Sequence, residues 1–270
     1  MKPAPRDAMR LPRATILMYH RVGVAPDVEE GDYVVPTTLF EDQMRLLAAR
    51  GRPVVSLASI AEGRYPDRSV ALTFDDGCDT DATVVAPILR GAGFTAAFFV
   101  NPALVGQDGR VSWAQLRALA DEGFLVGSHG LDHALLDDVP APELVRQIVE
   151  SKRWLEARLE RPVGAISLPG GGGGQRALRA AREAGYHLIL GSRPGRVRGP
   201  AGRGILPRLA VRRGDGPARF EAALEPRPFV LLGPALRYAL LRSARRVLGS
   251  RAYGTVRLRW LLRSAPPGRS

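Results

Sequence analysis

Two adjacent carboxylates follow a buried apolar run of this sequence. The run SVALTF (69–74) is typical of a buried strand, and Asp75 and Asp76 come directly after it. Neighbouring side chains at a strand end point in different directions, so one carboxylate can hold a metal ion while the other acts as a general base. Asp and Gly also favour turns and helix N-termini, so Asp-Asp-Gly alone would predict only a turn.

Two histidines four residues apart follow a second apolar run. His129 and His133 lie in SHGLDH (128–133), and this spacing lets both imidazoles reach one ion. With the carboxylate of Asp76 they would form a two-histidine, one-carboxylate site that leaves positions for water and substrate. Such a site suits zinc hydrolysis and also accepts other divalent transition metals. A pair of surface histidines would explain the spacing alone, so the prediction depends on the combination.

The elements that must position these residues alternate between apolar runs and amphipathic stretches. Strands are predicted at 14–20, 69–74, 95–100, 124–129, 163–169, 186–191 and 205–211, with helices at 37–50, 81–92, 112–123, 141–160, 176–185 and 217–224. This alternation predicts an α/β fold with a parallel sheet, a distorted (β/α) barrel of about seven strands. The catalytic body is expected to span 1–225, followed by a basic helical C-terminal appendage, 226–270. Carboxyl ends of parallel strands meet at one edge, where His20 would join the other site residues.

TFDDG (73–77) and SHGLDH (128–133) together resemble the first two motifs of the polysaccharide deacetylase family, the NodB-homology or carbohydrate esterase family 4 enzymes. The resemblance covers roughly residues 14–211 and implies a NodB-like barrel. It implies that Asp75 is the general base, and that Asp76, His129 and His133 bind the metal. MYHRV (18–22) resembles members with a permuted motif order that act on poly-N-acetylglucosamine, which implies that His20 is the general acid.

The third motif of the family is altered in this chain. In SLPGGGGG (167–174), Pro169 and Gly170 match the family pattern, whereas its arginine and its aromatic residue are missing. Backbone N–H groups of Gly170 or Gly171 could still bind an oxyanion, although a plain flexible connector explains the loop as well. Arg208, in LPRLAV, could supply the arginine that orients the base, and a surface arginine is an equal alternative.

The function expected from these residues is metal-dependent hydrolysis of an N-acetyl group, with Zn²⁺ as the first choice of ion. The substrate would be an N-acetylated amino sugar in a polysaccharide, as in exopolysaccharide biosynthesis, or in a lipid-linked glycan precursor, and acetate would be released. Two alternatives stay open: hydrolysis of a linear or cyclic amide that is not a sugar, and a catalytically silent glycan- or membrane-binding homologue. The missing third-motif arginine favours the silent homologue. The presence of all five predicted site residues disfavours it: His20, Asp75, Asp76, His129 and His133.

The net charge of +12 belongs mostly to the C-terminal appendage. Residues 226–270 contain ten arginines and no Asp or Glu, so the body is close to neutral. Within 229–248, Leu236, Leu240, Ala244 and Val247 share one helical face, which suits contact with an anionic membrane or packing on the barrel about equally. Nucleic-acid binding is not expected, because no binding module is present. No signal-like or membrane-spanning apolar run precedes the body, so a cytoplasmic protein is expected, with the inner membrane face as an option.

Overall fold

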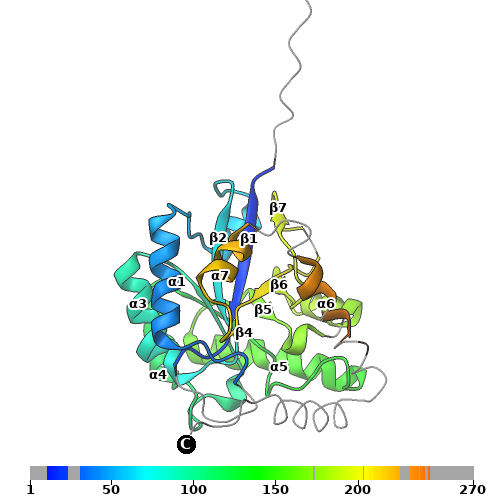
Figure 1. Cartoon of the computed structure of the whole chain (residues 1–270). Helices are drawn as coiled ribbons and strands as arrows, with labels where there is room; N and C mark the ends of the chain where they lie inside the picture. The colour runs from blue at the N-terminus through cyan, green and yellow to red at the C-terminus, as the bar shows by residue number, and fades with distance from the viewer. Residues whose placement is uncertain are drawn as a thin grey trace, which may run out of the picture.

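The computed structural model describes residues 11–23, 31–172, 174–202, 204–225, 231–236, 238–240 and 243 (Figure 1). The strands are β1 (Arg13–Tyr19), β2 (Ser69–Phe74), β3 (Ala97–Val100), β4 (Leu125–Ser128), β5 (Ala165–Ser167), β6 (Leu188–Leu190), β7 (Val197–Arg198) and β8 (Leu209–Ala210). The α-helices are α1 (Thr37–Ala49), α2 (Leu57–Glu62), α3 (Ala86–Ala92), α4 (Trp113–Asp121), α5 (Ala141–Leu159), α6 (Gly174–Glu183) and α7 (Pro217–Leu224).

The strands form one sheet in the order β6-β5-β4-β3-β2-β1-β7, with β8 also paired to β1. Seven strands run parallel, and only the short β7 is antiparallel to β1. The segment that leads into β8 also bridges β6, through Leu190 and Leu206. This segment therefore links the two sides of the curled sheet, and the predicted distorted β/α barrel is confirmed.

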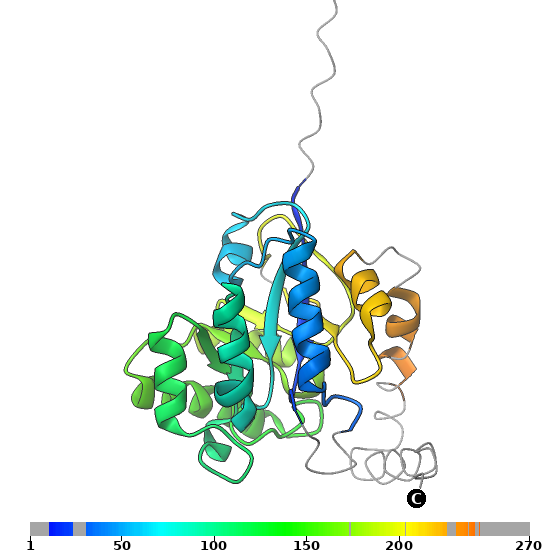
Figure 2. The same ribbon diagram turned by 60° about the vertical axis from the view of Figure 1, so that its left-hand side comes forward.

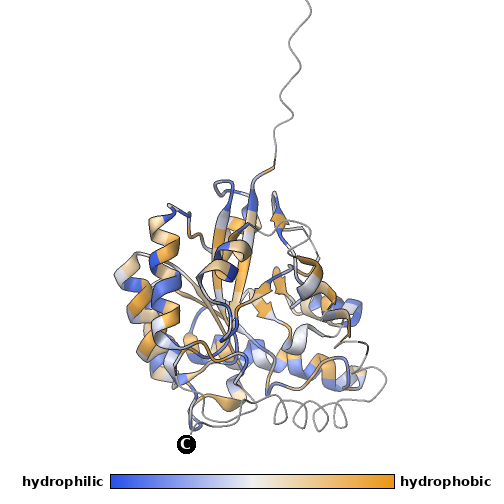
Figure 3. Cartoon of the chain, in the orientation of Figure 1, coloured by the Kyte–Doolittle hydropathy of each residue, from blue (hydrophilic) through white to orange (hydrophobic). Residues whose placement is uncertain are grey.

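Side chains alternate between the inside and the outside of the barrel. On β1 and β2, Ile16 and Ala71 belong to an inner apolar cluster, whereas Leu17 and Leu72 pack outward under α1 and α3. The helices carry polar residues on their outer faces, and the strands between them are mostly apolar (Figures 1 and 3). Because the period of a strand is two, the inner positions continue beyond β1 and β2 to His20 and Asp75.

Most predicted elements are present, with differences at their ends. The predicted helix at 81–92 starts as a π-helical turn, Asp81–Val85, before α3. The predicted strand at 163–169 stops at Ser167 and gives way to the 3₁₀ turn Pro169–Gly171, while the one at 205–211 is reduced to β8 and the bridge at Leu206. Helix α2 and strand β7 were not predicted, because both are very short.

The start of the predicted amphipathic helix in the appendage is helical over 231–236 and 238–240, and Figure 2 shows this segment in orange beyond α7. Ala244 and Val247 lie outside the described residues, as do most of 226–270. Among the helices that the structure describes, none has the length and apolar character needed to span a membrane.

Candidate active site

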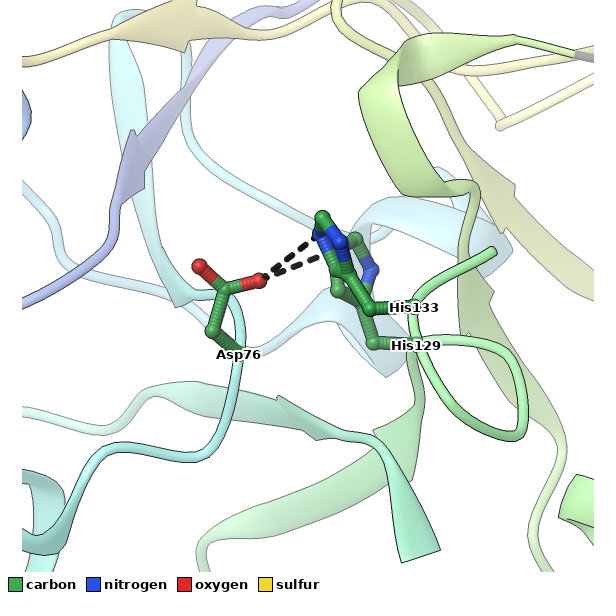
Figure 4. Close-up of side chains that lie close together, drawn as sticks. All are labelled: Asp76, His129 and His133. Atoms are coloured by element: carbon green, nitrogen blue, oxygen red, sulfur yellow. Dashed lines mark ion pairs between the residues drawn. The ribbon is translucent and has the colours of Figure 1, made fainter. Parts of the chain in front are cut away.

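One carboxylate and two imidazoles converge at the carboxyl edge of the sheet, and they are the three residues predicted as metal ligands. Asp76 Oδ1 lies 3.2 Å from His129 Nε2 and 3.3 Å from His133 Nε2 (Figure 4). One ligand atom from each residue fits within 4.8 Å of the others. Asp76 follows β2, and both histidines follow β4.

The ring orientation of His129 leaves its Nε2 free for a ligand bond. His129 Nδ1 lies 2.8 Å from the carbonyl oxygen of Ser167, which can only accept, so Nδ1 carries a proton and, in the neutral imidazole, Nε2 presents a lone pair. Asp76 Oδ1 is buried and has no hydrogen-bond partner among the described residues. Burial opposes ionisation of Asp76, but His129 and His133, when their Nε2 atoms are protonated, outweigh it and hold the pKa of Asp76 well below the usual range. Two nitrogen lone pairs and one carboxylate oxygen form a donor set that fits Zn²⁺.

Asp75 is held by a fully buried arginine. Arg208 Nη1 donates to Asp75 Oδ1 at 2.8 Å and Nη2 donates to Oδ2 at 2.7 Å, while Ser167 Oγ donates to Oδ2 at 3.0 Å. The remaining guanidinium N–H groups donate to Gly191 O, Thr73 Oγ1 and Ser167 Oγ, so all five donors are used. Arg208 has no exposed surface, and the alternative of a surface arginine is therefore wrong.

The bidentate pair keeps Asp75 ionised. Burial would raise the pKa of Asp75, but the charges of Arg208 and His129 bring it below its ordinary value. Oδ2 accepts two hydrogen bonds and Oδ1 accepts one, so Oδ1 keeps a lone pair on which a proton could be received. Asp75 thus combines a fixed orientation with one available basic atom.

His20 lies at the same edge, just beyond β1. Its ring packs against Tyr33 with 4.7 Å between centroids, and its Nδ1 is buried without a hydrogen-bond partner among the described residues. Burial lowers the pKa of His20, and the charges of Asp76 and Asp75 offset this in part.

The glycine loop after β5 also reaches this edge. Gly170 and Gly171 both have positive φ angles, and a Cβ at Gly171 would lie 2.7 Å from Ser192. The N–H groups of Gly171 and Gly172 donate to Leu168 O and Pro169 O. Among the described residues the N–H of Gly170 has no such acceptor, so of the two predicted donors Gly170 is the one that remains available.

A sequence model of the family described as "Polysaccharide deacetylase" matches residues 62–189, which include Asp75, both histidines of SHGLDH and Gly170. The segment 62–189 is therefore a polysaccharide deacetylase domain. His20 and Arg208 lie outside the matched segment, and their place in the site comes from the structure. Deacetylases of this family are enzymes that hydrolyse N-acetyl groups.

Two related proteins and one solved structure match between 47% and 80% of the chain. The "Putative polysaccharide deacetylase YxkH" of Bacillus subtilis (strain 168) is 26% identical over 215 residues, covering 78% of this chain and 75% of that protein. A peptidoglycan-N-acetylglucosamine deacetylase of Bacillus cereus is 29% identical over 134 residues, covering 47% and 57%. The structure of the Streptococcus pyogenes deacetylase PplD, in complex with acetate, superposes with a TM-score of 0.72 at 23% identity, covering 80% of this chain and 100% of that one.

Three buried polar residues of this candidate site were not predicted from the sequence. Ser167 touches Asp75, Arg208 and His129, while Asn101 and Gln147 bind the loop that carries the histidines. Ser167 and Asn101 stand at strand ends, the position that identified the other site residues. Gln147 lies in the middle of α5, where its only signal is a polar residue on the buried face of an amphipathic helix.

A further buried carboxyl near the site gives a prediction about stability. Asp81 is fully buried, and within the described part of the chain neither of its oxygens has a hydrogen-bond partner. Burial, and then the charge of Asp76, raise the pKa of Asp81 well above its ordinary value of 3.8. The folded protein therefore binds this proton more tightly than the unfolded chain, and stability falls as the pH rises above the ordinary value.

We expect Asp81→Asn to stabilise the metal-free protein at pH 8 by about 1–3 kcal/mol, because the variant need not bury a charge or hold a proton. The gain should shrink toward zero at pH 3, where Asp81 is mostly protonated in both states. Urea denaturation of both proteins at the two pH values measures this difference. A gain of equal size at both pH values would contradict the assignment of the shift to Asp81.

Proposed function

We propose that this chain is a metal-dependent N-deacetylase that removes acetyl groups from an N-acetylated amino sugar in a polysaccharide or a lipid-linked glycan precursor. The observation that carries the proposal is the convergence of Asp76, His129 and His133 beside Asp75, whose carboxylate is held by Arg208. The peptidoglycan-N-acetylglucosamine deacetylase among the relatives supports the choice of an amino-sugar substrate.

The proposed roles follow from the atoms that remain available. Asp76 Oδ1, His129 Nε2 and His133 Nε2 would hold a divalent ion, with Zn²⁺ as the best match to this donor set. When bound, such an ion would lower the pKa of a water molecule and polarise the acetyl carbonyl.

Asp75 Oδ1 would take the proton of the attacking water, and the N–H of Gly170 would donate to the developing oxyanion. His20 would deliver a proton to the departing amine, so acetate and a free amino sugar leave. Because burial lowers the pKa of His20, we propose that proton donation by this residue weakens as the pH rises.

The alternative of a silent homologue loses its main support, since an arginine that binds Asp75 is present, although it comes from position 208. Comparing kcat/KM for amino-sugar and non-sugar amides distinguishes the alternative of a non-sugar substrate from the proposed function. We expect acetate release from N-acetylglucosamine oligomers at a kcat/KM far above that for acetylated alkyl amines and cyclic amides. Equal or higher kcat/KM for the non-sugar amides would overturn the amino-sugar substrate and leave a general amide hydrolase.

We also propose that the appendage contacts an anionic membrane surface. Leu232, Leu236 and Leu240 recur every four residues on the described helical segment, and each is more than 60% exposed. The surrounding sequence from 226 to 270 supplies ten arginines without any acidic residue. Exposed leucines beside basic residues suit the interface of a membrane that contains anionic lipids.

Replacing Leu232, Leu236 and Leu240 together by serine should lower binding to vesicles containing phosphatidylserine by at least about tenfold, since three exposed apolar side chains are lost. Co-sedimentation of the full chain with such vesicles measures the effect. Acetate release from a soluble oligomer serves as the control and should not change. If the wild type and the triple variant sediment equally with the vesicles, the three leucines do not contribute to membrane binding. If neither protein sediments, the membrane proposal is wrong.

A further inference from the structure

The loop between the two histidine ligands is bound by buried amide side chains from two other elements. From the end of β3, Asn101 Nδ2 donates to the carbonyl oxygens of His129 and Gly130. From α5, Gln147 Oε1 accepts the N–H of Leu131 at 3.0 Å and that of Asp132 at 3.3 Å. The carbonyl groups and the N–H groups of this loop are therefore satisfied by different side chains.

Gln147 uses its full hydrogen-bonding capacity. Its Nε2 donates to Asp132 Oδ1 at 2.7 Å and to Glu143 Oε1 at 2.9 Å, in addition to the two N–H groups that Oε1 accepts. Two acceptor sites and two donors are all that a glutamine amide offers, and they also fix which atom is oxygen. Three of the four bonds go to Leu131 and Asp132, the two residues that directly precede His133.

The position of Gln147 on its helix is unusual for a residue that serves packing alone. The buried face of α5 contains Leu144, Ile148 and Leu155, yet Gln147 on that face has no exposed surface. Its partner Glu143 is held in turn by Arg146, whose Nε and Nη2 donate to the two carboxylate oxygens at 2.7 and 2.8 Å. These bonds, and then the one from Gln147, lower the pKa of Glu143 to about 2 and keep it ionised. A buried amide with every bond made specifies one arrangement of the groups around it.

The two histidines depend on this arrangement to different degrees. The side chain of His129 is 3% exposed and is already held by Ser167 O, whereas that of His133 is 43% exposed and its φ is +67°. Among the described residues no side-chain hydrogen bond other than the contact with Asp76 is found for His133. Its place beside Asp76 must then come from the backbone of the loop.

We propose that Gln147 is a positioning residue of the metal site, which holds His133 in place for the ion through the backbone of Leu131 and Asp132. This inference rests on the proposed metal site and goes beyond it, because it assigns a role to a residue of α5 whose four hydrogen bonds go to Leu131, Asp132 and Glu143 and not to a ligand side chain. Outer residues that orient metal ligands typically contribute about 10- to 100-fold to metal affinity.

The test measures Zn²⁺ affinity by competition with a chromophoric chelator, for the full chain and for Gln147→Leu. Leu155→Ala is the matched control, because this residue is buried on the same helix, two turns further along and away from the loop. Thermal unfolding of the metal-free proteins is recorded in parallel. We expect Gln147→Leu to bind Zn²⁺ about 10- to 100-fold more weakly, while Leu155→Ala loses stability and keeps its affinity.

Gln147→Glu is a second variant for the same Zn²⁺ affinity measurement. It keeps the acceptor for the two N–H groups but loses both donor bonds and adds a carboxylate beside Asp132 and Glu143, so we expect weakened affinity here as well. Wild-type affinity in both Gln147 variants would overturn the inference while leaving the proposed function intact. A weakening equal to that of Leu155→Ala would reduce Gln147 to a packing role. No Zn²⁺ binding by the wild type would overturn the metal site and the inference with it.

Discussion

Asp75→Asn is expected to lower kcat for acetate release by about 10² to 10⁴-fold, the range that general base catalysis usually contributes. The amide cannot accept the proton of the attacking water, and it presents N–H groups to the guanidinium of Arg208. Metal binding should survive, because the oxygens of Asp75 are engaged by Arg208 and Ser167 and not by the histidines. Acetate assays with N-acetylglucosamine oligomers and metal analysis on the same samples measure both quantities.

Asp76→Asn is the matched control for this variant. It alters the neighbouring carboxylate, which lies 3.2 and 3.3 Å from the two imidazoles, and it should lose the ion and the activity together. The pair of variants separates a base from a ligand although the two residues are adjacent in sequence. An Asp75→Asn protein that keeps wild-type kcat, or one that loses its metal, would show that the two roles are assigned to the wrong residues.

Arg208→Met is expected to destabilise the fold by about 3–5 kcal/mol, because it leaves the carboxylate of Asp75 buried without its charge partner. Since Arg208 holds the pKa of Asp75 down, the variant should also raise that pKa and reduce the fraction of ionised base at neutral pH. Urea denaturation gives the stability change, and the pH dependence of kcat/KM should show its acidic limb moved to higher pH.

Arg153→Met is the control for the loss of an arginine in an exposed ion pair. Arg153 pairs with Glu150 at 2.7 Å, but its side chain is 71% exposed, so its removal should cost less than about 1 kcal/mol. Arg208→Lys keeps the charge without the planar fork and should fall between wild type and Arg208→Met. Equal stability of the Arg208→Met and Arg153→Met proteins would contradict the account of a buried pair that orients the base.

The parallel barrel and the convergence of Asp76, His129 and His133 could be predicted because they depend on local patterns. Apolar runs give the strands, and the residues at the carboxyl end of each run fall at one edge of the sheet, which is how His20, Asp76 and His129 were found. Arg208 stayed ambiguous, since its sequence neighbourhood does not say whether its side chain turns inward. In the structure it follows the inward-facing Leu206 by two residues, and the strand period places it inside the barrel.

Other parts depend on contacts between distant segments and have no local signal. The bonds from Gln147 to the loop before His133 span 15 and 16 residues and depend on how α5 packs against β4. The closure of the sheet between β6 and β1 depends on the bridge at Leu206, which lies in a segment with little strand structure of its own. Such features follow from the curvature of the sheet, and periodicity in the sequence does not encode that curvature directly.

The most direct test of the central claim is acetate release from N-acetylglucosamine oligomers by protein stripped with a chelator and then titrated with Zn²⁺. The account predicts negligible release by the stripped protein and a rise that saturates at about one ion per chain. A His129→Ala, His133→Ala double variant should show no such rise. Two results would contradict the assignment of Asp76, His129 and His133 as the metal site of a deacetylase. One is full acetate release by the stripped protein, and the other is acetate release by the double variant that rises with Zn²⁺ to the wild-type level.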